Sequence, residues 1–298
     1  MKKHLLLLCL SVLSLTGMNA QGWPTTSYAD FKLENNITTE QELTNSNQFF
    51  ALKGNAVKSF TTADNVTYFG SGPIFYSCAE KGDTEANSNH IVQLIPFGDG
   101  RYYVYWPMTG AFLRDAKIYG DYNGANGWQY STSLITEAAL VSITSTNDGY
   151  FEISYDSEYK ESPITFYIGA ELRDGVSSKM KIFDLFHKQA LEEGDYTQQY
   201  SLPVAFNWSI YKADISDSVA KEISLRISDV AGIFISNTIY EAEYNLAIHG
   251  NFNGQCTNGE DKTLERLIDE AYALMESETV TLGEINNKKE ELAFFTFH

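Results

Sequence analysis

The stretch Val92-Gln93-Leu94-Ile95-Pro96-Phe97-Gly98-Asp99-Gly100-Arg101-Tyr102-Tyr103-Val104-Tyr105-Trp106 decides the fold. Its pattern, V-x-L-x-x-x-x-D-G-x-Y-x-V-x-W, returns 49 residues later as V-x-I-x-x-x-x-D-G-x-F-x-I-x-Y in residues 141–155. Self-similarity at a fixed period of about 20 to 50 residues is typical of repeated supersecondary units. Each copy places an Asp-Gly pair between two apolar runs, which predicts two strands joined by a tight hairpin turn.

Two weaker copies extend the repeat in both directions. Phe50 and Leu52 stand about one period before Tyr102 and Val104, and Trp208-x-Ile210 matches the Val-x-Leu pair that begins at Val92. We expect the matched positions Tyr102, Val104, Phe151 and Ile153 to be core residues. Short runs rich in Val, Ile, Tyr, Phe and Thr, separated by Gly, Asn, Asp and Pro, predict strands throughout this region. The predicted strands are 49–53, 66–70, 74–78, 90–97, 101–106, 140–145, 150–155, 164–168 and 206–212.

This order of motifs resembles a β-trefoil domain of the ricin-type, lectin-like kind, in which three repeats of four strands build a barrel. Residues 100–106 followed by 109–113 fit one repeat, and residues 206–210 resemble the closing strand. The sequence departs from the family in its polar Asn, which is replaced by Trp106 and Tyr155, while the first repeat has Gly54 there. The third repeat is longer than the second, and we place the excess in residues 173–199, which contain the helix-like stretch Met180 to Glu193.

The composition changes after Asp214, where apolar residues recur every three to four positions, as in amphipathic helices. Three helices with short connections are predicted, at residues 216–248, 263–275 and 282–295. In the last, Ile285 and Leu292 are expected to face inward, and residues 288–291 outward. The predicted fold class is therefore mainly β with α: a β-trefoil-like barrel followed by a small antiparallel helical bundle. The plan is similar to accessory regions of Bacteroidetes secreted and cell-surface proteins, and the bundle is loosely similar to the three-helix FIVAR type.

The first twenty residues have the build of a secretory signal peptide. A short basic start precedes the apolar run Leu5 to Leu15, which is too short to span a bilayer, and a small-residue exit ends at Ala20. We therefore predict export, to the cell surface or beyond. The predicted organisation is a signal peptide (1–20), a leader or edge segment (21–46), the β-trefoil-like domain (47–213) and the helical bundle (214–298). The apolar end at His298 suggests that further domains follow in a longer chain.

The net negative charge of the chain excludes some classes of binding partner. The formal net charge is -18, and loss of Lys2 and Lys3 with the signal peptide would make it -20. Such a surface repels phosphate backbones, so nucleic acid is not an expected partner, and neither is an anionic membrane. No membrane insertion is expected after signal cleavage. Cys78 and Cys256 would remain in the mature chain, and whether they pair stays open.

Aromatic side chains in the β region point to a glycan partner. A flat π face matches the C–H face of a sugar ring while nearby polar groups fix its orientation. The best candidate lies in residues 120–128, a loop rich in Gly and Asn that ends in Trp128. For Trp106 and Tyr155, the alternative is a place in the core at the end of a repeat strand. The predicted ligand-binding residues are Trp128, Tyr130, Asp121, Asn123, Trp106 and Tyr155.

Catalytic and metal motifs give little support to an enzyme. The loop at Asp121 fails the calcium pattern at Asn126 and Thr132, so it predicts a turn, and no metal or cofactor is expected. The histidines have no neighbouring Ser or Cys that would suggest an activated nucleophile. The predicted function is an exported, non-enzymatic, carbohydrate-binding module. The alternatives are the N-terminal part of a larger secreted carbohydrate-active hydrolase, a trefoil-type protease inhibitor, and a structural spacer.

Overall fold

The chain divides into two compact units, which we call the β unit and the helical unit. In the computed structural model, the described residues are 31–44, 48–55, 60–61, 67–68, 74–76, 81–83, 85–115, 131–159, 161–171, 178–193, 204–277 and 279–296. The β unit takes in Trp23–Pro96 and Gly100–Ser224, and the helical unit takes in Leu225–His298 with Phe97–Asp99. The boundary thus lies at Ser224, eleven residues after the predicted one at 213.

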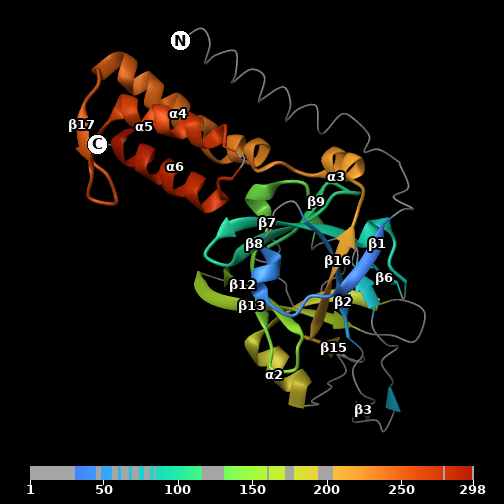
Figure 1. Cartoon of the computed structure of the whole chain (residues 1–298). Coiled ribbons are helices and arrows are strands. Elements are labelled where there is room, and N and C mark those ends of the chain that lie inside the picture. Colours follow the sequence, from blue (N-terminus) through green and yellow to red (C-terminus); the bar gives the residue numbers. More distant parts are fainter. Residues whose placement is uncertain are drawn as a thin grey trace. The chain divides into compact units, whose positions relative to one another are not determined.

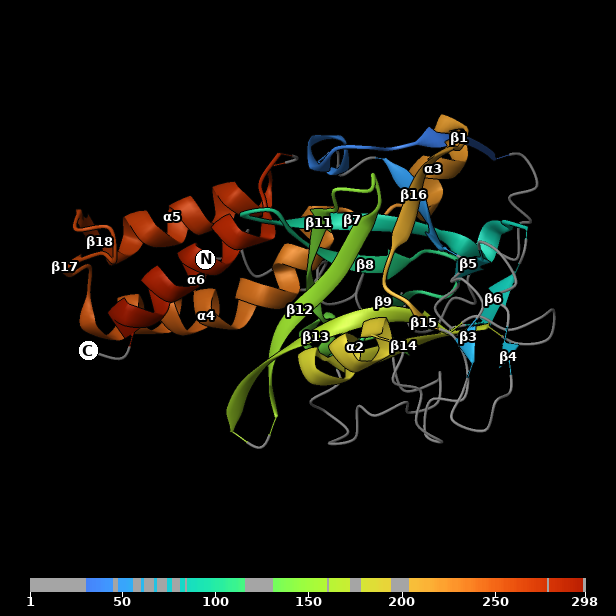
Figure 2. The ribbon, with the colours of Figure 1, turned by 90° about the horizontal axis from the view of Figure 1, so that it is seen from below.

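Six antiparallel strands of the β unit pair in a ring. They are β2 (Phe49–Gly54), β7 (Ile91–Gly98), β8 (Arg101–Trp106), β11 (Leu140–Ser145), β12 (Phe151–Tyr159) and β16 (Trp208–Asp214). Each pairs with the next in this order, and β16 pairs back with β2 from Trp208 opposite Gly54 to Ala213 opposite Phe49. Figures 1 and 2 show these strands gathered in the β unit. The large antiparallel sheet confirms the predicted β-rich class.

The remaining strands extend or flank this ring. Three pairs lie between successive ring strands: β5 (Ile74–Tyr76) with β6 (Lys81–Asp83), β9 (Ala111–Leu113) with β10 (Ser131–Thr132), and β13 (Ser162–Glu171) with β14 (Ser178–Asp184). β15 (Val204–Ala205) pairs with β13, and β3 (Phe60–Thr61) with β4 (Thr67–Tyr68). β1 (Lys32–Asn36) pairs with β16, so the predicted edge segment contributes a strand.

The matched positions of the sequence repeat form the core of the ring. Alternate residues of a strand point to the same face, so two positions per strand turn inward. All of these side chains are buried in one cluster, which confirms the core prediction for Tyr102, Val104, Phe151 and Ile153. The inward pairs are Phe50 and Leu52, Val92 and Leu94, Tyr102 and Val104, Val141 and Ile143, Phe151 and Ile153, and Trp208 and Ile210.

The two Asp-Gly pairs make different turns. Asp99 and Gly100 both have positive φ, 50° and 79°, as a two-residue turn between β7 and β8 requires. At the second pair only Gly149 has positive φ, 76°, and its N–H donates to the carbonyl of Thr146 at 3.2 Å. The second turn therefore spans more residues, although the sequence motif is the same.

The predicted helix-like stretch from Met180 to Glu193 is wrong in its first part. Residues up to Asp184 belong to β14, which pairs with β13 on one side and β6 on the other. The helix α2 begins only at Leu185 and ends at Glu193. The Asp184 carboxylate accepts the backbone N–H of His187 at 2.8 Å, so it caps the helix. The continuous pairing with β13, from Met180 opposite Ala170 to Asp184 opposite Phe166, outweighs the helical spacing of the apolar residues in this stretch.

The three predicted helices are present, but the first is divided into two helices, and only the second of these lies in the helical unit. α3 (Asp217–Ile223) belongs to the β unit, and α4 (Ile227–His249) begins the helical unit. α5 (Leu264–Met275) and α6 (Leu282–Thr296) pack against α4 and against each other (Figure 1). A short hairpin of β17 (Asn253–Gln255) and β18 (Asp261–Thr263) joins α4 to α5. The short helices η1 (Glu40–Leu43), η2 (Ser88–His90) and η5 (Ile135–Glu137) lie in the β unit.

One face of α6 differs from the sequence prediction. Ile285 and Leu292 are buried as expected, but Lys288 and Glu291, predicted to face outward, are only 8% and 7% exposed. The Lys288 ammonium pairs with Glu291 and with Glu270 of α5, the latter at 2.7 Å. Lys262 of β18 reaches the same Glu270 oxygen at 3.0 Å. These four residues, which we call the ionic cluster, tie β18, α5 and α6 together inside the unit.

Candidate ligand-binding pocket

The predicted aromatic ligand site divides into two groups in the structure. Trp128, Tyr130, Asp121 and Asn123 lie outside the described residues. Trp106 and Tyr155 belong to the core cluster and are 1% and 2% exposed, so neither ring is open to a ligand at the surface. Their burial agrees with the alternative stated for these two residues, a place in the core at the end of a repeat strand.

A surface pocket lies where β1 meets β16. Its volume is about 450 Å³, within the range of small-molecule sites, which is roughly 300 to 1,000 Å³. Four of the five lining side chains are polar, and all five belong to the β unit. The lining residues are Leu33, Glu34, Asn36, Glu42 and Lys212.

An irregularity in β1 shapes one side of the pocket. Leu33 pairs with Ala213 and Asn36 with Tyr211, so three steps along β1 match two along β16. Such a bulge bends a strand and redirects its side chains. The Asn36 side-chain oxygen accepts the backbone N–H of Ile210 at 3.1 Å. That bond orients the amide of Asn36 against β16, and the NH₂ group of the same amide remains as a hydrogen-bond donor.

The short helix η1 positions Glu42. Leu43 is fully buried, and the Glu40 carboxylate accepts the backbone N–H of Ser145 at 2.8 Å, so η1 is held against β11. The Glu42 carboxylate accepts the backbone N–H groups of Thr38 at 3.1 Å and Thr39 at 3.3 Å, which is one half of a capping box. The bond from Thr38, with those from Lys212 and Thr39, lowers the pKa of Glu42 below 4.5, so this carboxyl is ionised at neutral pH.

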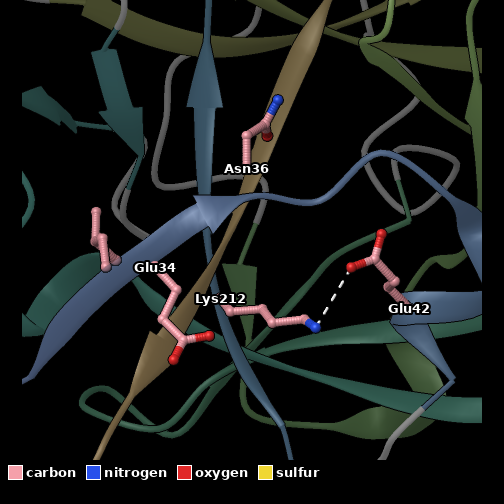
Figure 3. A pocket seen from close by; sticks show the side chains of 5 residues that line it. Glu34, Asn36, Glu42 and Lys212 are labelled. Carbon is pink, nitrogen blue, oxygen red and sulfur yellow. Dashed lines mark ion pairs between the residues drawn. The ribbon is translucent and has the colours of Figure 1, made fainter.

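Lys212 crosses the pocket between two carboxylates. Its ammonium lies 3.4 Å from Glu42 Oε1, and Figure 3 shows Glu34 on the other side of the lysine stem. The side chains of Lys212 and Glu42 are 30% and 35% exposed, so water screens their attraction and the pair adds little to stability. The pocket carries two acidic groups and one basic group. It therefore offers hydrogen-bond donors and acceptors side by side with an excess of negative charge.

Other chemical groups in the described part of the chain serve the fold. No group of three His, Cys, Asp or Glu side chains among the described residues is placed to hold a metal ion. The Nδ1 atom of His187 lies 2.7 Å from the Asp184 carboxylate that caps α2. Cys256 carries a free, buried thiol, and burial, followed by the nearby Glu291 carboxylate, raises its pKa. No helix in the described part is both long enough and apolar enough to cross a membrane.

The sequence reading missed every residue of this pocket. Leu33, Glu34, Asn36 and Glu42 fall in the segment predicted as a leader or edge, and Lys212 falls at the end of the predicted closing strand. A charged residue at the end of a strand is common, so Lys212 alone carries no signal. The pairing of β1 with β16 joins residues about 180 positions apart, and only that pairing brings the five together.

Comparison with known proteins finds no match for this chain among family models, curated proteins or solved structures.

Proposed function

We propose that the β unit is a β-trefoil-like domain. The order of its pairings supports this: six strands pair in a ring, and along the chain a two-stranded pair follows β2, β8 and β12, the first, third and fifth strands of that ring. The same two inward positions recur in all six ring strands, and they are the positions that the sequence repeat matches, at an interval of 49 residues from β7 to β11 and from β8 to β12. Three repeats of four strands account for both observations. A hydrogen-exchange or crystallographic determination that left β16 unpaired with β2 would contradict the proposal.

We further propose that the protein is an exported, non-enzymatic module that binds a neutral glycan in the pocket between β1 and β16. The observation that carries this is the alternation of donors and acceptors across the pocket, from Glu34 through Lys212 to Glu42, with the amide of Asn36 beside them. Sugar hydroxyls donate and accept at once, so they match such a lining. Leu33 supplies an apolar surface for the C–H face of a ring.

The charges of the pocket favour a neutral ligand over an anionic one. The pocket lining contains two carboxylates and one ammonium, and the whole chain carries a formal charge of -18, so a phosphate or uronic acid meets net repulsion. Glycoside hydrolysis needs one carboxylic acid that is protonated at working pH, and the lowered pKa of Glu42 makes that group unsuited to this role.

A glycan array probed with residues 21–298 tests this function. We expect binding to neutral glycans that falls about tenfold or more in Lys212→Met, because a hydrogen bond from a charged group contributes roughly 1.5 to 3 kcal/mol. Lys221→Met is the matched control, since Lys221 is an exposed lysine of α3 in the same unit. Thermal unfolding of both variants checks that the fold is retained.

Two outcomes would overturn the proposal. One is an absence of binding to any neutral glycan at millimolar concentration. The other is binding that survives Lys212→Met but is lost in Trp128→Ala, which would move the site to the loop predicted from the sequence. Potent inhibition of a protease without glycan binding would favour the inhibitor alternative instead.

A further inference from the structure

Helix α4 carries a second apolar face on the side opposite its packed one. Its buried residues include Val230, Ile235, Ile239 and Ala242, which face α5 and α6. On the other side four large apolar side chains are exposed: Ile233 at 43%, Tyr240 at 58%, Tyr244 at 60% and Ile248 at 55%. These are half of the large exposed apolar side chains found over the described residues of both units. We call this set the α4 stripe.

Three residues of the α4 stripe and two exposed neighbours have the spacing of a helix-pairing seam. Ile233, Asn237, Tyr240, Tyr244 and Ala247 follow one another at steps of four, three, four and three, and all five are exposed. Ile248 of the stripe lies one residue beyond the end of this seam. A 4-3 alternation is the a/d pattern by which one helix packs against another. The seam is about 21 Å long at 1.5 Å per residue, which suits a partner helix of roughly four turns. With its side chains about half exposed, the α4 stripe presents an apolar area on the order of 400 Å², comparable to the largest patch of a typical monomer, which is often functional.

The charged residues beside the α4 stripe favour a partner helix of opposite charge. Glu241 and Glu243 flank the seam at the positions that select partners in paired helices. The Tyr272 hydroxyl donates to Glu243 at 3.0 Å, which holds that carboxylate at the rim. The whole of α4, from Ile227 to His249, contains no Lys or Arg. A second copy of this chain would bring the same carboxylates to the seam with no basic residue to balance them.

We propose that the α4 stripe is a docking surface for an amphipathic helix of another protein whose apolar face is flanked by Lys or Arg. Apolar side chains of that helix would cover Tyr240 and Tyr244, and its basic residues would pair with Glu241 and Glu243. The proposal concerns the helical unit and is independent of the glycan function of the β unit. The two activities can therefore fail separately.

Two synthetic peptides of about 21 residues test the proposal on the whole chain, residues 21–298. Both have Leu at the a and d positions; one carries Lys at e and g, and the other carries Glu. We expect the basic peptide to bind with micromolar affinity and the acidic peptide to bind at least tenfold more weakly. The double variant Tyr240→Ser, Tyr244→Ser should bind the basic peptide at least tenfold more weakly than the wild type. Phe186→Ser, at an exposed apolar residue of the β unit, should bind it as the wild type does.

A charge reversal separates specific docking from general attraction to an acidic protein. Glu241→Lys should lower the affinity for the basic peptide several-fold and raise the affinity for the acidic peptide. Asp269→Lys, at an exposed position of α5, should leave both affinities unchanged. Equal responses to the two reversals would overturn the proposal. So would sedimentation of the wild-type chain as a dimer that dissociates in the double tyrosine variant, since the stripe would then be a self-association surface.

Discussion

Replacing Glu270 by Gln should destabilise the helical unit by removing the negative charge that two lysines share. The Glu270 Oε2 atom lies 3.0 Å from the Lys262 ammonium and 2.7 Å from that of Lys288, and both lysines are 8% exposed. Partial burial alone would raise the pKa of Glu270, but the bonds from Lys288 and Lys262 outweigh it and lower the pKa to about 2. The substitution leaves the Lys288 ammonium with the carboxylate of Glu291, and the Lys262 ammonium with those of Glu260 at 3.6 Å and Glu291 at 3.9 Å.

The size of the effect follows from that pKa. A shift from 4.5 to about 2 corresponds to roughly 3.4 kcal/mol at about 1.36 kcal/mol per unit. The Glu270 side chain is 29% exposed, so we take about half of this, roughly 2 kcal/mol, to allow for screening by water. Because the folded-state pKa is the lower one, the stabilisation is complete above about pH 5 and is lost as pH falls toward 2. The gap between wild type and Glu270→Gln should close over the same range.

In a urea titration, two spectroscopic probes distinguish the unfolding of the β unit from that of the helical unit. Trp106 and Trp208 are buried in the core of the β unit, so their fluorescence follows that unit. Circular dichroism at 222 nm follows the helices, most of which lie in the helical unit. We expect the urea concentration at which half of the helical unit is unfolded to fall by about 2 M in Glu270→Gln at pH 7. This takes the free energy of unfolding to change by roughly 1 kcal/mol per M of urea.

The control is Asp269→Asn, an exposed neighbour on the same helix, which should change stability by less than about 0.5 kcal/mol. The fluorescence transition should be the same in both variants. A helical midpoint in Glu270→Gln equal to that of wild type at pH 7, or a stability gap that does not change between pH 5 and 2, would refute the reasoning.

Three further predictions concern single contacts. Ile210→Ala removes a fully buried side chain of the ring core and should cost about 2 to 5 kcal/mol in the fluorescence transition; a loss below 1 kcal/mol would contradict its place in the core. Gly54→Ala would set a Cβ 2.4 Å from that of Ala170, so we expect a loss of roughly 1 to 3 kcal/mol by the same probe, whereas a neutral result would mean that β2 and β13 are not so close. Thr263→Ala removes the acceptor for the backbone N–H of Arg266 and should cost about 1 kcal/mol in the helical transition, with Thr263→Ser as the variant that should restore it.

The β unit was predictable where the sequence repeats. β8 and β11 have the predicted bounds, because their apolar alternation is clear and Asp-Gly or loop residues delimit them. The first repeat departs from the pattern at Gly54 for a reason that no sequence shows: any larger side chain would meet Ala170 and Tyr76. The stretch before Asp184 was misread because its neighbours in the sheet, and not its local spacing, decide that it is a strand.

Polar groups were harder to predict than apolar ones. Lys288 and Glu291 look like solvent-facing residues at helical spacing, and only Lys262 and Glu270, from two other elements, make their burial favourable. The pocket has the same character, since β1 and β16 bring Glu34 and Lys212 together from distant parts of the sequence. Aromatic rings suggested a site at Trp106 and Tyr155, but large apolar surface is equally what a core requires.

Hydrogen exchange with and without the best-binding glycan of the array tests the central proposal most directly. The account predicts slower exchange in residues 32–44 and 208–214, which contain β1, η1 and β16, and no change in α4, α5 or α6. Lys212→Met should abolish that protection at the same glycan concentration. Protection confined to residues 120–130, or no protection anywhere despite binding, would contradict the assignment of the glycan site to this pocket.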